Sequence, residues 1–131
     1  ASFYRTVRMD NQPNNEIKIE VIQGGLGFFH DRERLEAIPH ETTEQTEVLH
    51  KNGTLSMARA EPGSASSEFF ICVREQPELD FGGQRNPDEQ GFAAFGQVIS
   101  GMDVVLKIQS LKDDGQMLIN PVKILDVIRV E

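Results

Sequence analysis

Two charged residues stand among apolar neighbours in this sequence, Glu68 in SEFFICV and Arg5 in SFYRTV. Side chains of a β-strand alternate between its two faces, so Glu68 shares a face with Phe70 and Cys72, while Phe69 points the other way. One face of this strand can therefore belong to the core, and the other can form the floor of a polar site.

Arg5 lies in a second alternating segment, where it shares a predicted face with Phe3 and Val7. This position has two interpretations. Either the side chain runs along an apolar surface and its charge reaches solvent at the edge of a barrel, or Arg5 belongs to a functional site.

Other patterns that could support catalysis are incomplete. The segment HETTE lacks the second histidine of the helical zinc motif, GGLG lacks the lysine of a phosphate-binding loop, and no serine lies in a nucleophile elbow. The single cysteine, Cys72, excludes an intrachain disulfide and lies in an apolar run, which favours an inert buried thiol. We expect no metal site and no cofactor.

The elements that must position Arg5 and Glu68 are mostly short strands. A hairpin is expected around the turn DNQPNN, followed by a bend in QGGLGFF after the second strand, and one helix is expected in SGMDVVLKIQSL. Residues 31–38 could form a helical turn or two, and 40–48 are expected to form a surface loop. The polar segment 74–91 is a candidate binding loop. The strands are expected within 2–9, 16–22, 53–60, 67–73, 92–99 and 120–131.

Composition limits the class of partner. A chain of 131 residues with a formal net charge of -8 suits one compact domain and argues against nucleic acid or an anionic membrane as a partner. No apolar run is long enough to span a membrane, and the first residues lack the apolar core of a signal peptide. The compartment stays undetermined between the cytoplasm and a bacterial periplasm.

The motifs FYR, QGG, GTLSMARA, SASSEFFI, LDFGGQR and FAAFGQVISGMDVV, in this order, resemble the cyclophilin family of peptidyl-prolyl cis/trans isomerases, and bacterial members most. The resemblance covers the chain from its first residues to its last predicted strand. It implies a mainly β fold, a closed antiparallel barrel capped by short helices, with a groove on the outer face of the sheet and Phe69 inside the barrel.

The resemblance also implies roles for individual residues. Arg5 and Gln23 match the catalytic positions, with Arg5 donating a hydrogen bond to the prolyl nitrogen as the X-Pro bond twists. The positions that match the substrate-binding groove are Val21, Ala58, Arg59, Glu68, Phe70, Leu79 and Phe92.

Several positions depart from the family pattern. The segment between Arg5 and Gln23 is longer than in most relatives, and Glu20 and Val21 replace a phenylalanine and a methionine of the pocket. The groove glutamine is Glu68, and a tryptophan of some relatives is Glu78. If Glu68 pairs with Arg5, it either orients the guanidinium or holds it away from substrate.

The family carries two strands and a helix before the FYR motif, whereas this sequence begins at that motif. We expect residues 1–131 to form a single cyclophilin-like domain that is a truncated part of a longer product. The alternative is that the open sheet pairs with another chain, which would make the protein self-associate.

Three functions fit these observations. The first is an active isomerase acting on X-Pro bonds of peptides and unfolded proteins. The second is a module of the same fold that binds proline-containing segments with little or no turnover. The third is a structural protein without a ligand, which would leave the placement of Arg5, Gln23 and Phe70 unexplained.

Overall fold

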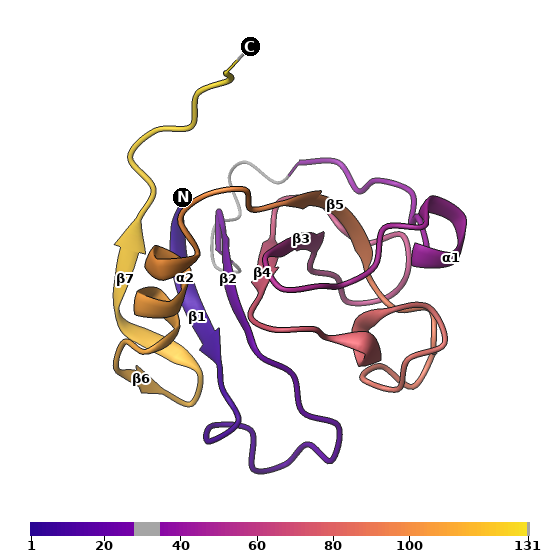
Figure 1. The fold of residues 1–131 in the computed structure, drawn as a ribbon, viewed down its shortest axis with the longest axis horizontal. Coiled ribbons are helices and arrows are strands. Elements are labelled where there is room, and N and C mark those ends of the chain that lie inside the picture. Colours follow the sequence, from indigo (N-terminus) through magenta and orange to yellow (C-terminus); the bar gives the residue numbers. More distant parts are fainter. Residues whose placement is uncertain (28–34, 131) are drawn as a thin grey trace.

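The computed structural model describes residues 1–27 and 35–130, and its main feature is one antiparallel sheet of seven strands in the order β5-β3-β4-β2-β1-β7-β6 (Figure 1). The strands are β1 (Ser2–Val7), β2 (Val21–Gly25), β3 (Thr54–Met57), β4 (Phe69–Cys72), β5 (Ala93–Gln97), β6 (Asp113–Asp114) and β7 (Met117–Lys123). Two α-helices and one 3-10 helix accompany them: α1 (Thr43–Thr46), α2 (Met102–Gln109) and η1 (Pro77–Leu79). The expectation of a mainly β fold is confirmed. Within the described residues the sheet does not close, since β5 and β6 are its edges.

Apolar side chains pack on both faces of this sheet. The face that α2 covers carries a cluster of Ile22, Ile71, Val73, Val105, Ile108 and Leu118, with Phe69 packed against it (Figure 1). The opposite face carries a second cluster of Val7, Ile19, Val21, Phe70, Cys72 and Leu79. The alternation predicted for SEFFICV is therefore confirmed, because Phe70 and Cys72 lie on one face and Phe69 lies on the other.

The first hairpin forms, but its second strand begins later than predicted. Residues 16–20 are outside β2, because the side-chain amide of Gln12 bonds both the backbone oxygen and the backbone nitrogen of Ile19, at 2.6 and 3.1 Å. The bend expected in QGGLGFF is confirmed at Leu26, directly after β2; residues 23–25 belong to the strand, and Phe28 and Phe29 lie outside the described residues. At Gly24, a Cβ would lie 2.9 Å from the Phe3 ring, so glycine permits this close approach.

A bulge in β1 changes the faces of its side chains. The register of β1 shifts between Phe3 and Arg5 against both β2 and β7. Phe3 consequently packs edge to face on Phe69, with ring centroids 5.7 Å apart, while Val7 and Arg5 lie on the opposite face. The prediction that Arg5 shares a face with Val7 is confirmed, and the prediction that it shares that face with Phe3 is wrong.

Three other predicted elements differ in the structure. Residues 43–46 form a one-turn helix, α1, in a segment read as loop, and Thr42 and Gln45 form a capping box at its start. The last strand is displaced toward the N-terminus, because β7 ends at Lys123 and residues 124–130 extend away from the sheet (Figure 1). Of the helical turns expected over 31–38, residues 31–34 lie outside the described part, and 35–38 are not helical.

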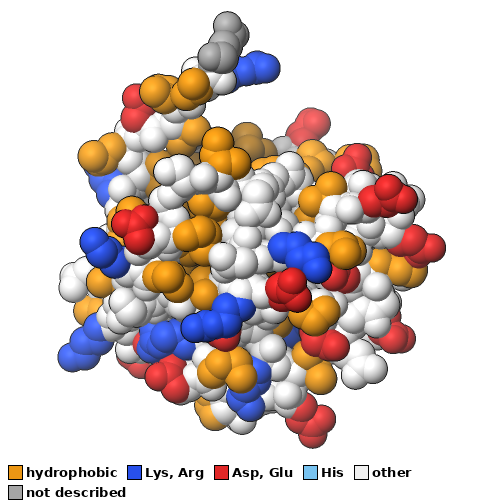
Figure 2. Space-filling view, viewed as in Figure 1, with side chains coloured by type: hydrophobic (Ala, Val, Ile, Leu, Met, Phe, Trp, Pro, Cys, Tyr) orange, Lys and Arg blue, Asp and Glu red, His pale blue; other side chains and the backbone are white. Residues whose placement is uncertain are grey.

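The surface carries charges of both signs. On the face seen in Figure 2, acidic side chains gather on the side of α1, and basic ones lie mostly over the other half. In the described part of the chain, no helix has both the length and the apolar character needed to cross a membrane.

Candidate functional site

An open pocket of about 490 Å³ lies on the face of the sheet opposite α2. Its lining comes from β1, β2, the segment after β3, β4, η1 and the segment before β5. Every residue that the sequence proposed for the site contributes to this one lining: Arg5, Val21, Gln23, Ala58, Arg59, Glu68, Phe70, Leu79 and Phe92.

The guanidinium of Arg5 is held by two side-chain amides. Its Nη1 donates to Gln23 Oε1 at 2.7 Å, and its Nε and Nη2 both donate to Gln116 Oε1, at 3.2 and 2.7 Å. Burial lowers the pKa of Arg5 from its ordinary value, and an arginine remains charged at neutral pH. Because both acceptors are neutral, the positive charge is oriented without being cancelled.

Gln116 is a contributor to the site that the sequence did not suggest. It lies in the turn between β6 and β7 with φ of 78°, and its backbone nitrogen donates to Asp113 Oδ2 at 3.0 Å. Its side-chain nitrogen donates to the backbone oxygen of Asn11 at 3.0 Å. Gln116, which orients Arg5, is therefore held in place by both the long segment after β1 and the β6–β7 hairpin.

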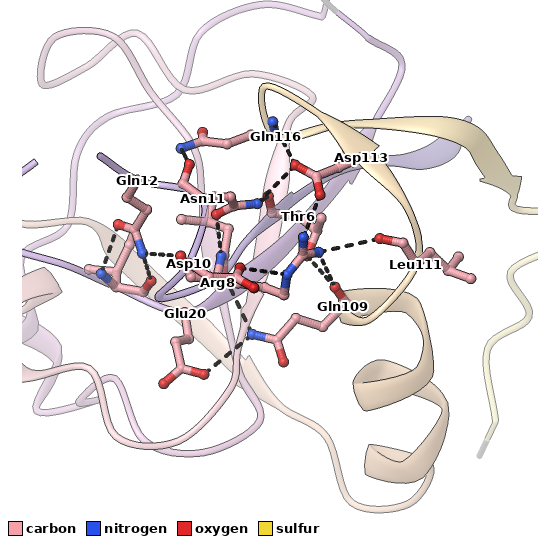
Figure 3. A network of polar contacts seen from close by, with 12 residues as sticks. Thr6, Arg8, Asp10, Asn11, Gln12, Glu20, Gln109, Leu111, Asp113 and Gln116 are labelled. Carbon is pink, nitrogen blue, oxygen red and sulfur yellow. Dashed lines mark hydrogen bonds and ion pairs between the residues drawn. The ribbon is translucent and has the colours of Figure 1, made fainter. Parts of the chain in front are cut away.

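Arg8 also connects β1 with the β6–β7 hairpin, as Figure 3 shows. Its guanidinium forms an ion pair with Asp113 and donates to the backbone oxygen of Gln109 at 2.9 Å, at the end of α2. Asn11 also donates to Asp113, at 3.1 Å. This network connects β1, α2 and the hairpin that carries Gln116.

Gln116→Asn tests the positioning of Arg5. Asparagine tolerates the left-handed backbone of residue 116 but is one methylene shorter, so it should lose the contact with Arg5. Under the isomerase role that the sequence resemblance implies, we expect a fall in kcat of about three- to tenfold with little change in KM, the size of one lost hydrogen bond of about 1 kcal/mol. Peptide isomerisation kinetics would measure this, and a variant with unchanged kcat would exclude a positioning role for Gln116.

Glu68 lies in the pocket but does not bond directly to Arg5. Its Oε1 accepts from Tyr4 Oη at 2.6 Å and from the backbone nitrogen of Gly27 at 3.0 Å, and its Oε2 accepts from Ser67. Gln23 donates to the same Tyr4 oxygen at 3.0 Å. The Glu68 carboxylate and the Arg5 guanidinium are thus linked through Tyr4 and Gln23, two neutral side chains. The sequence suggested a direct pair that either orients Arg5 or holds it away from substrate, and this indirect link is neither of the two.

Tyr4 can take part in this link because of the bulge, which brings its side chain and that of Arg5 toward the same partners. Burial raises the pKa of Tyr4 above its ordinary value of 10.0, and the hydrogen bond to Glu68 raises it further. The phenol is therefore a donor to Glu68 throughout the neutral range.

The other two acidic departures from the family pattern lie outside the lining. Glu20 forms an ion pair with Arg74, and Glu78 accepts a hydrogen bond from the backbone nitrogen of Gln84 at 3.0 Å. Val21 remains in the pocket wall, beside Ile19 of the same apolar cluster.

Two phenylalanines form the aromatic part of the pocket. Phe70 meets Phe92 edge to face, with ring centroids 5.4 Å apart, and on its other side it stacks on His50 at 6.0 Å with an interplanar angle of 15°. Leu79 is fully buried beside them. Packing on both sides fixes the orientation of the Phe70 ring.

The imidazole of His50 stacks on the Phe70 ring, and His50 is 1% exposed. Its Nδ1 lies 2.8 Å from Asp80 Oδ1, and its Nε2 lies 2.8 Å from Ser56 Oγ. Burial lowers the pKa of His50 from its ordinary value of 6.5, although Asp80 acts in the opposite direction. Of the other two histidines, His40 lies 3.1 Å from the backbone oxygen of Gln90, and His30 lies outside the described residues.

The buried imidazole predicts a pH dependence of stability. Because burial lowers the pKa of His50 in the folded state below its ordinary value of 6.5, the unfolded state binds the proton more readily, and the free energy of unfolding should fall as the pH drops below about 6.5. Asp88 and Asp113, whose pKa values are lowered from 3.8, contribute losses only at more acidic pH.

Urea unfolding at several pH values would measure this loss of stability. His50→Gln should be less stable than the wild type but lack this pH dependence, whereas His40→Gln should keep it. A wild-type stability that stays constant between these pH values would contradict the interpretation.

Arg59 is neutralised by a neighbour. It donates to both carboxylate oxygens of Asp88 at 3.0 and 3.1 Å and to the backbone oxygen of Gly91, and its guanidinium carbon lies 4.9 Å from the Phe92 ring centroid. Ala58, beside it, donates its backbone N–H to Glu68 O at 3.0 Å. These contacts fix one wall of the pocket.

Two observations bear on nucleophilic and metal chemistry. Burial raises the pKa of the Cys72 thiol to about 12, so it stays protonated at neutral pH. Among residues 1–27 and 35–130, no group of three or more His, Cys, Asp or Glu side chains could hold a metal ion.

Several residues of the lining were missed by the sequence interpretation. Ile19 could have been found, because it alternates with Val21, and Arg85 and Asn86 lie in the segment already considered a binding loop. The remainder come from turns whose position depends on the tertiary fold: Leu26, Gly27, Ala60, Ser64, Ser66 and Ser67.

The fold and the pocket together define a class of protein. It is mainly β and has an open, partly apolar pocket on one face of its sheet, with a fixed guanidinium and two phenylalanine rings in the same lining. The family model described as cyclophilin type peptidyl-prolyl cis-trans isomerase/CLD matches residues 2–129. The chain belongs to the cyclophilin-type peptidyl-prolyl cis-trans isomerase family, as the motifs indicated.

Individual relatives agree with this assignment. The chain is 38% identical over 92 residues to a peptidyl-prolyl cis-trans isomerase of Acinetobacter baylyi, a match that covers 70% of this chain and 47% of the relative. It is 40% identical over 96 residues to peptidyl-prolyl cis-trans isomerase A of Dickeya dadantii, covering 72% and 48%. The aligned part is therefore about half the length of these two relatives.

Solved structures show the same fold at low sequence identity. A cyclophilin type peptidyl-prolyl cis-trans isomerase of Cryptosporidium parvum superimposes with a TM-score of 0.67 and 22% identity, covering 98% of this chain and 76% of the other. A second structure of that protein, in the presence of the dipeptide Ala-Pro, gives a TM-score of 0.63 at 22% identity, with coverages of 99% and 78%.

Proposed function

We propose that the pocket binds X-Pro segments of peptides and unfolded proteins and catalyses their cis/trans isomerisation. The observation that carries this proposal is the guanidinium of Arg5, fixed by Gln23 and Gln116 in the same lining as the apolar wall of Val21, Phe70 and Leu79. An apolar recess for the pyrrolidine ring beside an oriented donor is what this reaction requires.

The chemistry needs neither a nucleophile nor a cofactor. Rotation about an X-Pro bond is slow because amide resonance opposes it, with a barrier of about 18–20 kcal/mol. When the bond twists, the prolyl nitrogen becomes pyramidal and gains a lone pair that can accept a hydrogen bond. Arg5 donates to this lone pair only in the twisted state, so the interaction stabilises the transition state more than the ground state.

The remaining residues hold the substrate. Phe70, Leu79, Val21 and Phe92 enclose the proline ring, while Ala58 and Arg59 bind the backbone beside it. Holding the chain on both sides of the bond while one donor acts at the nitrogen limits the motion to rotation. In support of this ligand class, the Cryptosporidium parvum neighbour was solved in the presence of Ala-Pro.

We further propose that residues 1–131 form one cyclophilin-like domain whose complete sheet is a closed barrel. The clusters on the two faces of the sheet share its central strands, which supports a single domain, and β5 and β6 are the edges that a closed barrel would have to pair. Pairing of these two edges, directly or through a further strand, would close the sheet.

A refolding assay tests the proposed function. The protein should accelerate, at substoichiometric concentration, a refolding phase of a second protein that is limited by prolyl isomerisation. If it slows or arrests refolding while binding the unfolded chain, the pocket is a binding module instead. If it neither accelerates refolding nor binds, both functions are excluded.

A further inference from the structure

Arg85 is a second guanidinium in the pocket lining, and the proposed mechanism does not use it. It lies in the loop after η1, and its Nη1 donates to Gln12 Oε1 at 3.1 Å and to the backbone oxygen of Ile17 at 2.6 Å. Within the described part of the chain, its Nε and Nη2 donate no hydrogen bond. One side of this guanidinium is therefore anchored, and the rest is available to a ligand.

Arg5 and Arg85 both lack an acidic partner. Among residues 1–27 and 35–130, neither forms an ion pair, since their hydrogen-bond acceptors are side-chain amides and a backbone carbonyl. Arg59 differs, because Asp88 neutralises it. Burial lowers the pKa of Arg85, and the positive charge of Arg5 in the same lining lowers it further. Two uncompensated positive charges in a partly apolar pocket favour an anion.

The acidic group in the lining does not cancel these charges. Glu68 lies beyond the opposite end of β2, beside Gly25 and Gly27, where it accepts hydrogen bonds from Tyr4, Ser67 and the backbone of Gly27. Arg85 lies near the start of β2, against residues 12–17. The pocket therefore has a positive end and a negative end.

We propose that Arg85 and Arg5 form a subsite for an anionic side chain, a carboxylate or a phosphate, on a residue next to the proline of the substrate. This specificity rests on the proposed function, since it places an acidic X-Pro or Pro-X segment in the isomerase pocket. The planar guanidinium of Arg85 suits either anion, because it offers its remaining N–H groups in a fixed geometry. The overall charge of -8 does not prevent this, because exposed charges more than about 8 Å away are largely screened in physiological salt.

Peptide binding measured by calorimetry would test the subsite, using matched pairs: Glu-Pro with Gln-Pro, Pro-Glu with Pro-Gln, and phosphoserine-Pro with Ser-Pro. In at least one pair the acidic peptide should bind about tenfold more tightly, the size of one charge-assisted hydrogen bond. The three pairs show whether the anion precedes or follows the proline, and whether phosphate is accepted. The preference should decrease as salt rises.

Variants assign the preference to Arg85. Arg85→Gln should remove most of it and Arg85→Lys should retain part, with folding checked by thermal unfolding. Arg74→Gln is the matched control, since it makes the same change of charge at a side chain that is 69% exposed and outside the lining. Equal binding within every pair, or an equal loss in Arg74→Gln, would overturn the proposal.

Isomerisation of the neutral peptides separates this inference from the proposed function. Turnover of neutral peptides without an acidic preference would refute the subsite and leave the isomerase intact. An acidic preference without turnover of any peptide would refute the isomerase and leave the anion subsite of a binding module.

Discussion

Arg5→Ala is expected to lower kcat/KM for an X-Pro peptide by about ten- to a hundredfold, because a hydrogen bond from a charged donor contributes about 1.5–3 kcal/mol and each 1.4 kcal/mol is tenfold in rate. The fall should appear mainly in kcat, since the donor acts on the twisted bond. Arg5→Lys should recover little, because an ammonium cannot engage both Gln23 and Gln116 in the fork geometry that holds the guanidinium.

The control for Arg5→Ala is Arg74→Ala. Arg74 pairs with Glu20 outside the pocket lining, so its removal changes the net charge equally and should leave kcat/KM within about twofold of the wild type. Stability measured in parallel would show whether each variant is folded. If the two variants lose activity equally, Arg5 acts through the general charge of the protein and not as a positioned donor.

Phe70→Ala is expected to have the largest effect on stability, about 3–5 kcal/mol in the free energy of unfolding, as is typical when a buried phenylalanine is removed. The ring is 5% exposed and packs between Phe92 and His50, so its loss leaves a cavity and also opens the proline recess. Urea unfolding followed by circular dichroism would measure the change.

Phe95→Ala is the matched control for Phe70→Ala, because the same side chain is 57% exposed on β5. It should change the free energy of unfolding by no more than about 0.5 kcal/mol. Phe70→Leu, which retains much of the buried volume, should stay folded and bind peptide more weakly. Equal destabilisation by the two alanine variants would show that Phe70 is not part of a packed core.

Much of the fold could be predicted because its determinants are local. The alternation in SEFFICV assigned Phe69 and Phe70 to different faces, and the spacing of Val105 and Ile108 indicated α2. The bulge at Tyr4 could not be predicted in this way. It arises where β1 pairs with β2 and β7 at once, and a register between strands far apart in sequence leaves no local signal.

The site shows the same division. The motif positions lie in one lining, but what holds Arg5 depends on Gln116, which is 111 residues away and reaches the guanidinium through a turn set by Asp113 and Asn11. The link from Glu68 to Arg5 could not be predicted from the sequence either, because it passes through Tyr4 and depends on the bulge in β1. Long-range hydrogen bonds of this kind are specified by tertiary packing and not by spacing along the chain.

Arg5, oriented by Gln23 and Gln116, is expected to accelerate rotation about an X-Pro bond in this pocket. Two-dimensional exchange NMR on an Ala-Pro peptide with substoichiometric protein tests it most directly, since the unassisted exchange takes tens to hundreds of seconds. The wild type should produce cis–trans exchange cross-peaks at mixing times well below a second, and Arg5→Ala should lower the catalysed exchange rate about ten- to a hundredfold. Peptide resonances that shift on binding while exchange remains at the unassisted rate would contradict this expectation.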